Sequence, residues 1–158
     1  MKGIIKNSAK IVGIADKLPE HPYIFKQFSI ERTLVLPESK PDISHLVEVN
    51  TKINILKKKM IKTPAISSLE RQVLTGKYLS IEGNLIQKIE YAADVPTQVV
   101  HAAEFNIPFC TSIMLPKDYI LDTSITITPY IEDLCSSLIN QRTLFENIIL
   151  LMDGSLYH

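Results

Sequence analysis

The sequence predicts an all-β fold, a single antiparallel β-sandwich or barrel-like domain with a long central hairpin, from three observations. First, Ile, Val and Thr fill 41 of 158 positions, whereas Ala, the best helix former, occurs seven times. Second, apolar and polar residues alternate over long stretches, as in strands with one solvated side. Third, 158 residues suit one domain rather than two. We expect roughly six to eight strands.

The clearest element is the central hairpin, expected between residues 79 and 115 around a turn at 94–97. Gly83 and Pro108 interrupt its two strands, and we interpret both as bulges rather than breaks. Proline removes a ladder donor, so Pro108 belongs at a sheet edge or in a bulge. The side chains expected on one face of the hairpin are Leu79, Ile81, Leu85, Ile89, Tyr91, Val99, His101, Ala103, Phe105, Ile107, Phe109, Thr111, Ile113 and Leu115.

Two further strands precede the hairpin. Residues 28–36 alternate up to Pro37, and residues 47–61 alternate with one apolar and one polar face. The loop 37–43 contains two prolines, and residues 42–49 are compatible with a single helical turn. The side chains of the second strand expected on its apolar face are Val47, Val49, Thr51, Ile53, Ile55 and Ile61.

The two ends of the chain give less uniform patterns. Residues 1–22 form an N-terminal arm, which is flexible or adds a strand, ahead of a β domain at 23–158. Residues 124–133 alternate cleanly, but apolar residues between 134 and 152 also have the spacing of a helix face. We favour two strands with a turn at Asn140–Gln141, because the surrounding sequence is rich in Ile and Thr. A helix is the alternative for 134–152.

The charge balance argues against two classes of partner. Seventeen Lys and Arg match seventeen Asp and Glu, so whole-chain electrostatics favours neither nucleic acid nor an anionic membrane. No run of 18 apolar residues is present, and we expect no membrane insertion. The lysines at 57–59 and Lys62 point to both faces of a strand, where lysines typically protect an edge.

Motifs of catalysis are absent from the sequence. No GxSxG, HExxH, GxGxxG, P-loop or EF-hand pattern occurs, so we assign no catalytic, cofactor or metal residue and expect no small-molecule substrate. His101 is a candidate ligand or base, but a core or interface histidine is the preferred interpretation. Glu132 and Asp133 are adjacent on a strand, point to opposite faces and are interpreted as solvated. Four aromatic residues are interpreted as core rather than as a ligand groove: Tyr78, Tyr91, Phe105 and Phe109.

The two cysteines, Cys110 and Cys135, have neither a CxxC spacing nor nearby Cys/His pairs for zinc. We interpret them first as ordinary buried or half-buried thiols. A disulfide between them, or between copies of the chain, is the alternative if the final location is oxidising.

A set of segments resembles one known family. The segments are LTGK at Leu74–Lys77, IEG at Ile81–Gly83, KIEYAAD at Lys88–Asp94, PTQVVHAAEF at Pro96–Phe105, ITPYIEDL at Ile127–Leu134 and, upstream, LPESKPDISHLVEVNTKI at Leu36–Ile53. Their order and spacing resemble the SPOCS domain family, which includes the clostridial spore coat assembly protein SipL. The resemblance extends over about residues 25–152.

The resemblance implies a non-enzymatic structural protein, made in the mother-cell cytoplasm and then located on the spore surface, in the coat or exosporium. We expect it to self-associate into a homo-oligomer, to meet other coat or exosporium proteins, and to gain an inter-subunit disulfide through Cys110 or Cys135 in an oxidising exterior. The sequence ends at His158 without the LysM domain that SipL carries, which favours a building block. A monomeric adaptor that recruits a coat protein or glycan is the alternative.

Overall fold

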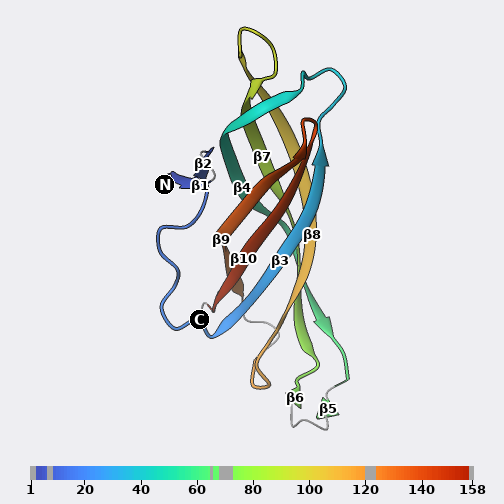
Figure 1. Ribbon diagram of the computed structural model, residues 1–158. Helices are drawn as coiled ribbons and strands as arrows, with labels where there is room; N and C mark the ends of the chain where they lie inside the picture. Colours follow the sequence, from blue (N-terminus) through green and yellow to red (C-terminus); the bar gives the residue numbers. More distant parts are fainter. Residues whose placement is uncertain (1–2, 7–8, 65, 68–72, 120–123, 157–158) are drawn as a thin grey trace.

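Two β-sheets pack face to face (Figure 1). A computed structural model describes residues 3–6, 9–64, 66–67, 73–119 and 124–156. The large sheet has the order β1-β2-β4-β7-β8, the small sheet the order β3-β10-β9, and β5 and β6 form a separate short hairpin. The all-β prediction is confirmed. The strands are β1 (Ile4–Lys6), β2 (Ala9–Val12), β3 (Ile24–Val35), β4 (Ile43–Lys62), β5 (Ile66–Ser67), β6 (Val73–Leu74), β7 (Lys77–Ala93), β8 (Val100–Met114), β9 (Ile125–Asn140) and β10 (Thr143–Leu156).

The central hairpin is β7 and β8, as predicted, but the interpretation of Gly83 and Pro108 as bulges in it is wrong. The two strands pair without interruption from Tyr78 with Met114 to Ala92 with Val100. Gly83 stays in register, and the Cβ that it lacks would lie 2.5 Å from the Phe109 ring, so the glycine permits close packing there. Pro108 also stays in register and lies on β8, the edge strand of the large sheet.

Strand β4 carries the bulges that the sequence pattern did not reveal. Its pairing with β7 shifts at three places, which leave Ser44, Val47 and Leu56 unpaired. Each extra residue reverses which parity faces the core. The expectation that Val47 and Ile61 share the buried face of Val49 is therefore wrong. Val49 is fully buried, whereas Val47, itself a bulge residue, is 36% exposed, and Ile61, which lies past the bulge at Leu56, is 37% exposed.

The start of β4 corrects a second expectation. Residues 43–49 are extended and pair with β7, so no helical turn forms within 42–49. The loop before them holds its two prolines, and Ile43 enters the core with 1% exposure. Burial of Ile43 in the first strand position explains why the chain becomes extended immediately after the loop.

The C-terminal third is a hairpin of β9 and β10, as favoured from the sequence, and the helix alternative is wrong. The two strands meet at a turn that includes Gln141 and Arg142. A register shift leaves Glu132 without a pairing partner on β10. This bulge turns both Ile131 and Leu134 toward the core.

The N-terminal arm adds a strand, one of the two alternatives for residues 1–22. Strand β2 pairs in parallel with Glu48–Asn50 of β4. Ile11 and Ile14 are 2% and 6% exposed and belong to the core. Full burial of one such side chain contributes about 1.5–3 kcal/mol, so the described part of the arm is an integral part of the fold.

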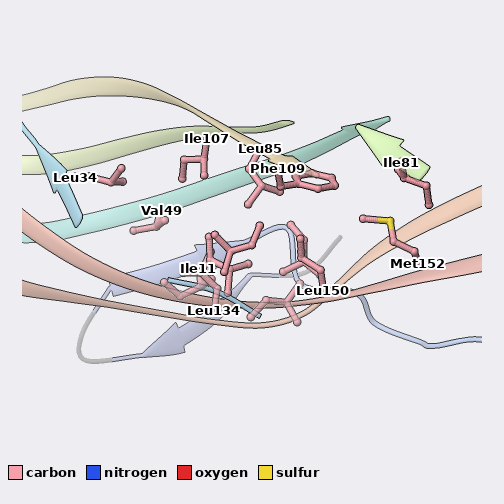
Figure 2. Packing of buried hydrophobic residues seen from close by; sticks show 14 of the residues in the cluster. Ile11, Leu34, Val49, Ile81, Leu85, Ile107, Phe109, Leu134, Leu150 and Met152 are labelled. Atoms are coloured by element: carbon pink, nitrogen blue, oxygen red, sulfur yellow. The ribbon is translucent and has the colours of Figure 1, made fainter. Parts of the chain in front are cut away.

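The core lies between the two sheets, whose side chains interdigitate (Figure 2). None of the described residues belongs to a helix that could cross a membrane. The labelled core residues are Val49, Ile81, Leu85, Ile107 and Phe109 from the large sheet, Leu34, Leu134, Leu150 and Met152 from the small sheet, and Ile11 from the arm.

Candidate functional site: the arm groove

The candidate site is the gap between the edge of β4 and the edge of β9, here called the arm groove because the arm lies in it. On one wall, β2 pairs with Glu48–Asn50 of β4. On the other wall, the Ala15 N–H donates to the Ile131 carbonyl of β9 at 2.9 Å. Figure 1 shows β2 beside β4, on the side of the sandwich where the N-terminus lies. The arm therefore connects the large sheet to the small sheet.

A cavity of about 530 Å³ continues the arm groove past the end of β2. Its lining comes from three segments: Asp16 and Lys17 of the arm, Lys52 and Asn54 of β4, and Tyr130 of β9. Among the described residues, β2 pairs with β4 at Glu48–Asn50 only, so the rest of that β4 edge faces this cavity or solvent. An open strand edge beside a groove is the arrangement that accepts an added extended segment.

Both cysteines are exposed, which corrects the first interpretation of buried or half-buried thiols. Cys110 follows the core residue Phe109 on β8, and Cys135 follows the core residue Leu134 on β9. Because side chains alternate along a strand, the two thiols lie on the outer faces of different sheets. They are free, and this placement rules out the disulfide between them within one chain.

His101 lies in the core-facing series of β8 and is half-buried. Its ring stacks on Tyr91 with centroids 6.1 Å apart, and the Tyr91 hydroxyl donates to the Pro41 carbonyl at 2.8 Å. Burial raises the pKa of Tyr91 above its usual value. His101 does not line the cavity in the arm groove. The preferred interpretation as a packing histidine matches this position.

The predicted aromatic core is present, most clearly at two residues. Tyr91 is fully buried, and Phe109 contacts Phe28 of β3 with ring centroids 5.8 Å apart. This contact closes the side of the sandwich where β8 and β3 lie next to each other. Tyr78 and Phe105 are half-buried.

The carboxylate pair is split by the β9 bulge. Glu132 is unpaired in the bulge, and Asp133 pairs with Ile149 of β10. The Gln27 amide of β3 donates to the Glu132 carboxylate, so the two side chains meet across β10. Glu132 and Asp133 are half-buried rather than fully solvated. Within the described ranges, no group of three or more His, Cys, Asp or Glu side chains is placed to hold a metal ion.

The lysines of β4 lie past the part of the strand that pairs with β2. Among the described residues no strand pairs with β4 there on the side opposite β7, so the lysines stand at a sheet edge, as expected for edge protection. Lys57 and Lys59 are exposed. Lys58 is also exposed, and its ammonium donates to the Ile125 carbonyl of β9 at 2.8 Å. The lysines protect the far part of this edge, whereas the arm covers the near part.

A chain of polar side chains crosses the core and was not foreseen from the sequence. Gln87 of β7 donates to Thr51 Oγ1 at 3.0 Å, and Ser136 of β9 donates to Glu146 Oε1 of β10 at 2.9 Å. Gln87 also contacts Glu146. Thr51, Gln87 and Glu146 are at most 2% exposed, so four strands and both sheets are linked through polar groups inside the core.

Burial is the largest influence on the pKa of Glu146. Gln87 Oε1 and Glu146 Oε2 are both buried without a hydrogen-bond partner in the described residues. Burial raises the pKa of Glu146 above its usual value, while the bonds from Gln87 and Ser136 lower it. The net effect is a raised pKa, which favours the neutral carboxylic acid.

One end of the sandwich is held by Arg142, in the turn between β9 and β10. Its Nη1 donates to Asp42 Oδ1 at 2.7 Å and to the Lys40 carbonyl at 3.0 Å, and its Nη2 donates to the Pro37 carbonyl at 2.8 Å. The Leu36 N–H donates to the Arg142 carbonyl at 2.9 Å. Arg142 thus fixes the loop between β3 and β4.

The sequence contained a signal for Glu146 but only a weak one for Arg142. Glu146 shares its parity with Leu144 and Ile148, so a charged residue stands in a buried series. Arg142 lies beside the predicted turn, yet its partners are some 100 residues earlier, as the separation from Asp42 shows. Such long-range partners are not visible in a local pattern.

Comparison with known families gives one match. A family model described as SipL, SPOCS domain, matches residues 42–139, which is more than half of the chain. The matched region contains β4, β7 and β8 and nearly all of β9, and it leaves out the arm, β3 and β10. No curated protein and no solved structure matches the chain significantly.

Proposed function

The chain belongs to the SipL SPOCS-domain family, and from this premise we propose that it is a non-enzymatic structural protein of the endospore surface that self-associates into a homo-oligomer. Family membership indicates a role in sporulation and the spore coat, since the family is one of structural and coat-assembly proteins. Self-association, the exosporium and the identity of partner proteins are the proposed part.

The observation that carries the proposal is the arm groove. A sandwich whose side is closed by a short arm strand offers backbone groups and apolar surface to another chain when that arm is displaced. A net charge of zero also leaves no long-range repulsion between copies. Both features favour association of identical subunits.

The proposed location follows from the family role. We expect synthesis in the mother-cell cytoplasm and assembly on the spore surface. Immunogold labelling of sections from sporulating cells tests this directly. Gold over the coat or exosporium of released spores supports the proposal, and gold confined to the mother-cell cytoplasm contradicts it.

The two exposed thiols are candidates for an inter-subunit disulfide. Their positions on the outer faces of different sheets allow each thiol to meet another copy. A variant with Cys110→Ser and Cys135→Ser should assemble but lose its resistance to denaturant under oxidising conditions. Unchanged resistance to denaturant would contradict the inter-subunit disulfide.

The second candidate is a monomeric adaptor that recruits another coat protein or a glycan. The cavity of about 530 Å³ in the arm groove favours it, because Asp16, Lys52 and Tyr130 offer charged and aromatic contacts to a ligand. A monomer that captures one defined coat component from sporulating cells, and loses it with Tyr130→Ala, would establish the adaptor. An oligomer with no such capture favours the building block.

A further inference from the structure

We propose that the N-terminal arm is exchanged between copies, so that the arm of one subunit fills the arm groove of the next. This inference rests on the self-association proposed above and names the contact that produces it. Its occupant is defined by the chain itself, because the arm lies in the groove and its side chains fit there.

The first step concerns what the arm contributes. Ala9, Ile11 and Ile14 are at most 6% exposed, and Ile11 and Ile14 belong to the same core cluster as Leu134 of β9. These side chains fill the space between β4 and β9 that no other strand covers in the described residues. An empty groove would expose this part of the core to water, so each groove requires an arm from some chain.

The second step concerns how the arm is held. Its backbone pairing consists of Lys10 with Glu48, Ile11 with Val49 and Val12 with Asn50, together with the bond from Ala15 to Ile131. Every one of these contacts is made by residues 9–15, and none depends on which chain supplies them. Exchange therefore preserves all contacts of the arm, which is the condition for low-cost strand swapping.

The third step concerns the connection between the arm and β3. Because the contacts of the arm extend to Ala15, eight residues, 16–23, connect it to Ile24, and they form no named strand. Fully extended, they span roughly 26 Å. Gly13 has a φ of +122°, and the Cβ that it lacks would lie 2.2 Å from the Thr51 carbonyl oxygen, so the chain turns away from β4 at a residue that only glycine tolerates. A connection of this length, after the turn at Gly13, allows the arm to reach a neighbour.

The fourth step concerns the remaining edges. The far part of the β4 edge carries lysines, and the β8 edge carries Pro108, which has no N–H to donate. On the opposite side of the sandwich, Phe28 and Phe109 close the gap between β3 and β8. The arm groove is thus the side of the described structure best suited to receive a strand from another copy.

The test uses paired cysteines in the full chain, with Cys110 and Cys135 changed to Ser. Lys10→Cys is placed in one tagged chain and Glu48→Cys in a second chain with a different tag, and the two are co-expressed and oxidised. Exchange predicts a covalent heterodimer that carries both tags. The pair Val12→Cys with Asn50→Cys gives a second position if the first pair does not fold.

The matched control is Lys88→Cys with Glu104→Cys, which pair within the central hairpin. Strands β7 and β8 are joined by a short connection, so this control should link only when both cysteines are in one chain. A heterodimer from the control pair at the same yield would mean random collision and would overturn the inference.

Light scattering on the same samples separates the two proposals. Oligomers that give no heterodimer through the arm pair would overturn exchange while leaving self-association in place. Strict monomers, with cross-links only when both arm cysteines are in one chain, would overturn both proposals.

Discussion

At the scale of single residues, buried polar side chains connect the two sheets, and the pattern of apolar residues does not reveal these contacts. Glu146 is fully buried, and its carboxyl group joins the two sheets through its contact with Gln87. The charged residue opposite it on β3 is Arg32, whose guanidinium is exposed and donates to the Glu31 carbonyl. The residues facing Glu146 from β7 and β9 are Gln87 and Ser136, both uncharged. These two neutral side chains lower the pKa of Glu146, but they only partly offset burial, which raises it.

The protonation of Glu146 predicts a pH dependence of stability. Because its pKa is raised in the folded state, its contribution is fully present below the ordinary carboxyl pKa of about 4.5 and is lost as the pH rises through the folded-state pKa. The unfolding free energy of the wild type should therefore fall with rising pH over this window. Urea titrations at several pH values measure this trend.

The variant Glu146→Gln isolates this residue, because the amide keeps the shape and cannot ionise. Its stability should fall less with pH than that of the wild type. Asp153, whose pKa is also raised by burial, contributes a trend of the same sign and is unchanged in both proteins. Identical pH slopes for the two proteins would show that Glu146 is ionised in the core.

Arg142 predicts a local effect on the loop between β3 and β4. In Arg142→Lys, one ammonium replaces a guanidinium whose two terminal nitrogens reach three acceptors, so the loop should open more often. Cleavage by a glutamate-specific protease at the exposed Glu38 should accelerate several-fold. Arg32→Lys is the matched control, since the Arg32 side chain donates to its neighbour Glu31. Equal acceleration in both variants would contradict the role of Arg142.

At the scale of elements, the alternation of apolar and polar residues predicted the long strands. It did not predict which side chains face the core beyond each bulge. The series from Leu79 to Tyr91 runs without a bulge in β7, and its face was predicted correctly throughout. In β4 and β9, single unpaired residues reverse the parity, and nothing in the local sequence marks Leu56 or Glu132 as unpaired. A bulge depends on the register with a neighbour, which is a long-range property.

The candidate site shows the same limit. Cys110 and Cys135 could be named from the sequence, but their exposure depends on the faces of two different sheets. The arm groove could not be predicted, because it exists only where β4 and β9, far apart in the sequence, come to lie beside each other. Only the alternative of an added strand for the arm anticipated it.

The β8 edge gives a prediction about unwanted association. Pro108→Val restores an N–H on an edge strand and raises β propensity, so the variant should aggregate faster on heating. Asn106→Val, the outward neighbour two residues away, changes propensity without adding a donor. Turbidity measured against temperature compares the two. Equal aggregation would mean that hydrophobicity, not the missing donor, protects this edge.

At the scale of the whole molecule, the fold combines a sandwich of two sheets with an N-terminal arm that closes one side of it. The large and small sheets share a core, and the arm completes it at the side where β4 and β9 lie. The SPOCS match covers most of the large sheet but not the arm, which we propose is exchanged between copies.

The importance of the arm for stability is testable at Ile11. Ile11→Ala removes a core side chain that is 2% exposed, and it should cost about 2–5 kcal/mol of unfolding free energy. Lys10→Ala, the outward neighbour, should cost less than about 0.5 kcal/mol. Equal, small effects of both substitutions would mean that the arm does not contribute to the core in solution.

The most direct test of the central claim is the mass of the full chain in solution. Size-exclusion chromatography with light scattering, over a wide concentration range and with and without reductant, gives that mass. Self-association predicts a species at a multiple of the 17.8 kDa chain mass that persists in reductant and becomes resistant to dilution after oxidation. A particle of 17.8 kDa at every concentration and in both redox conditions would contradict it.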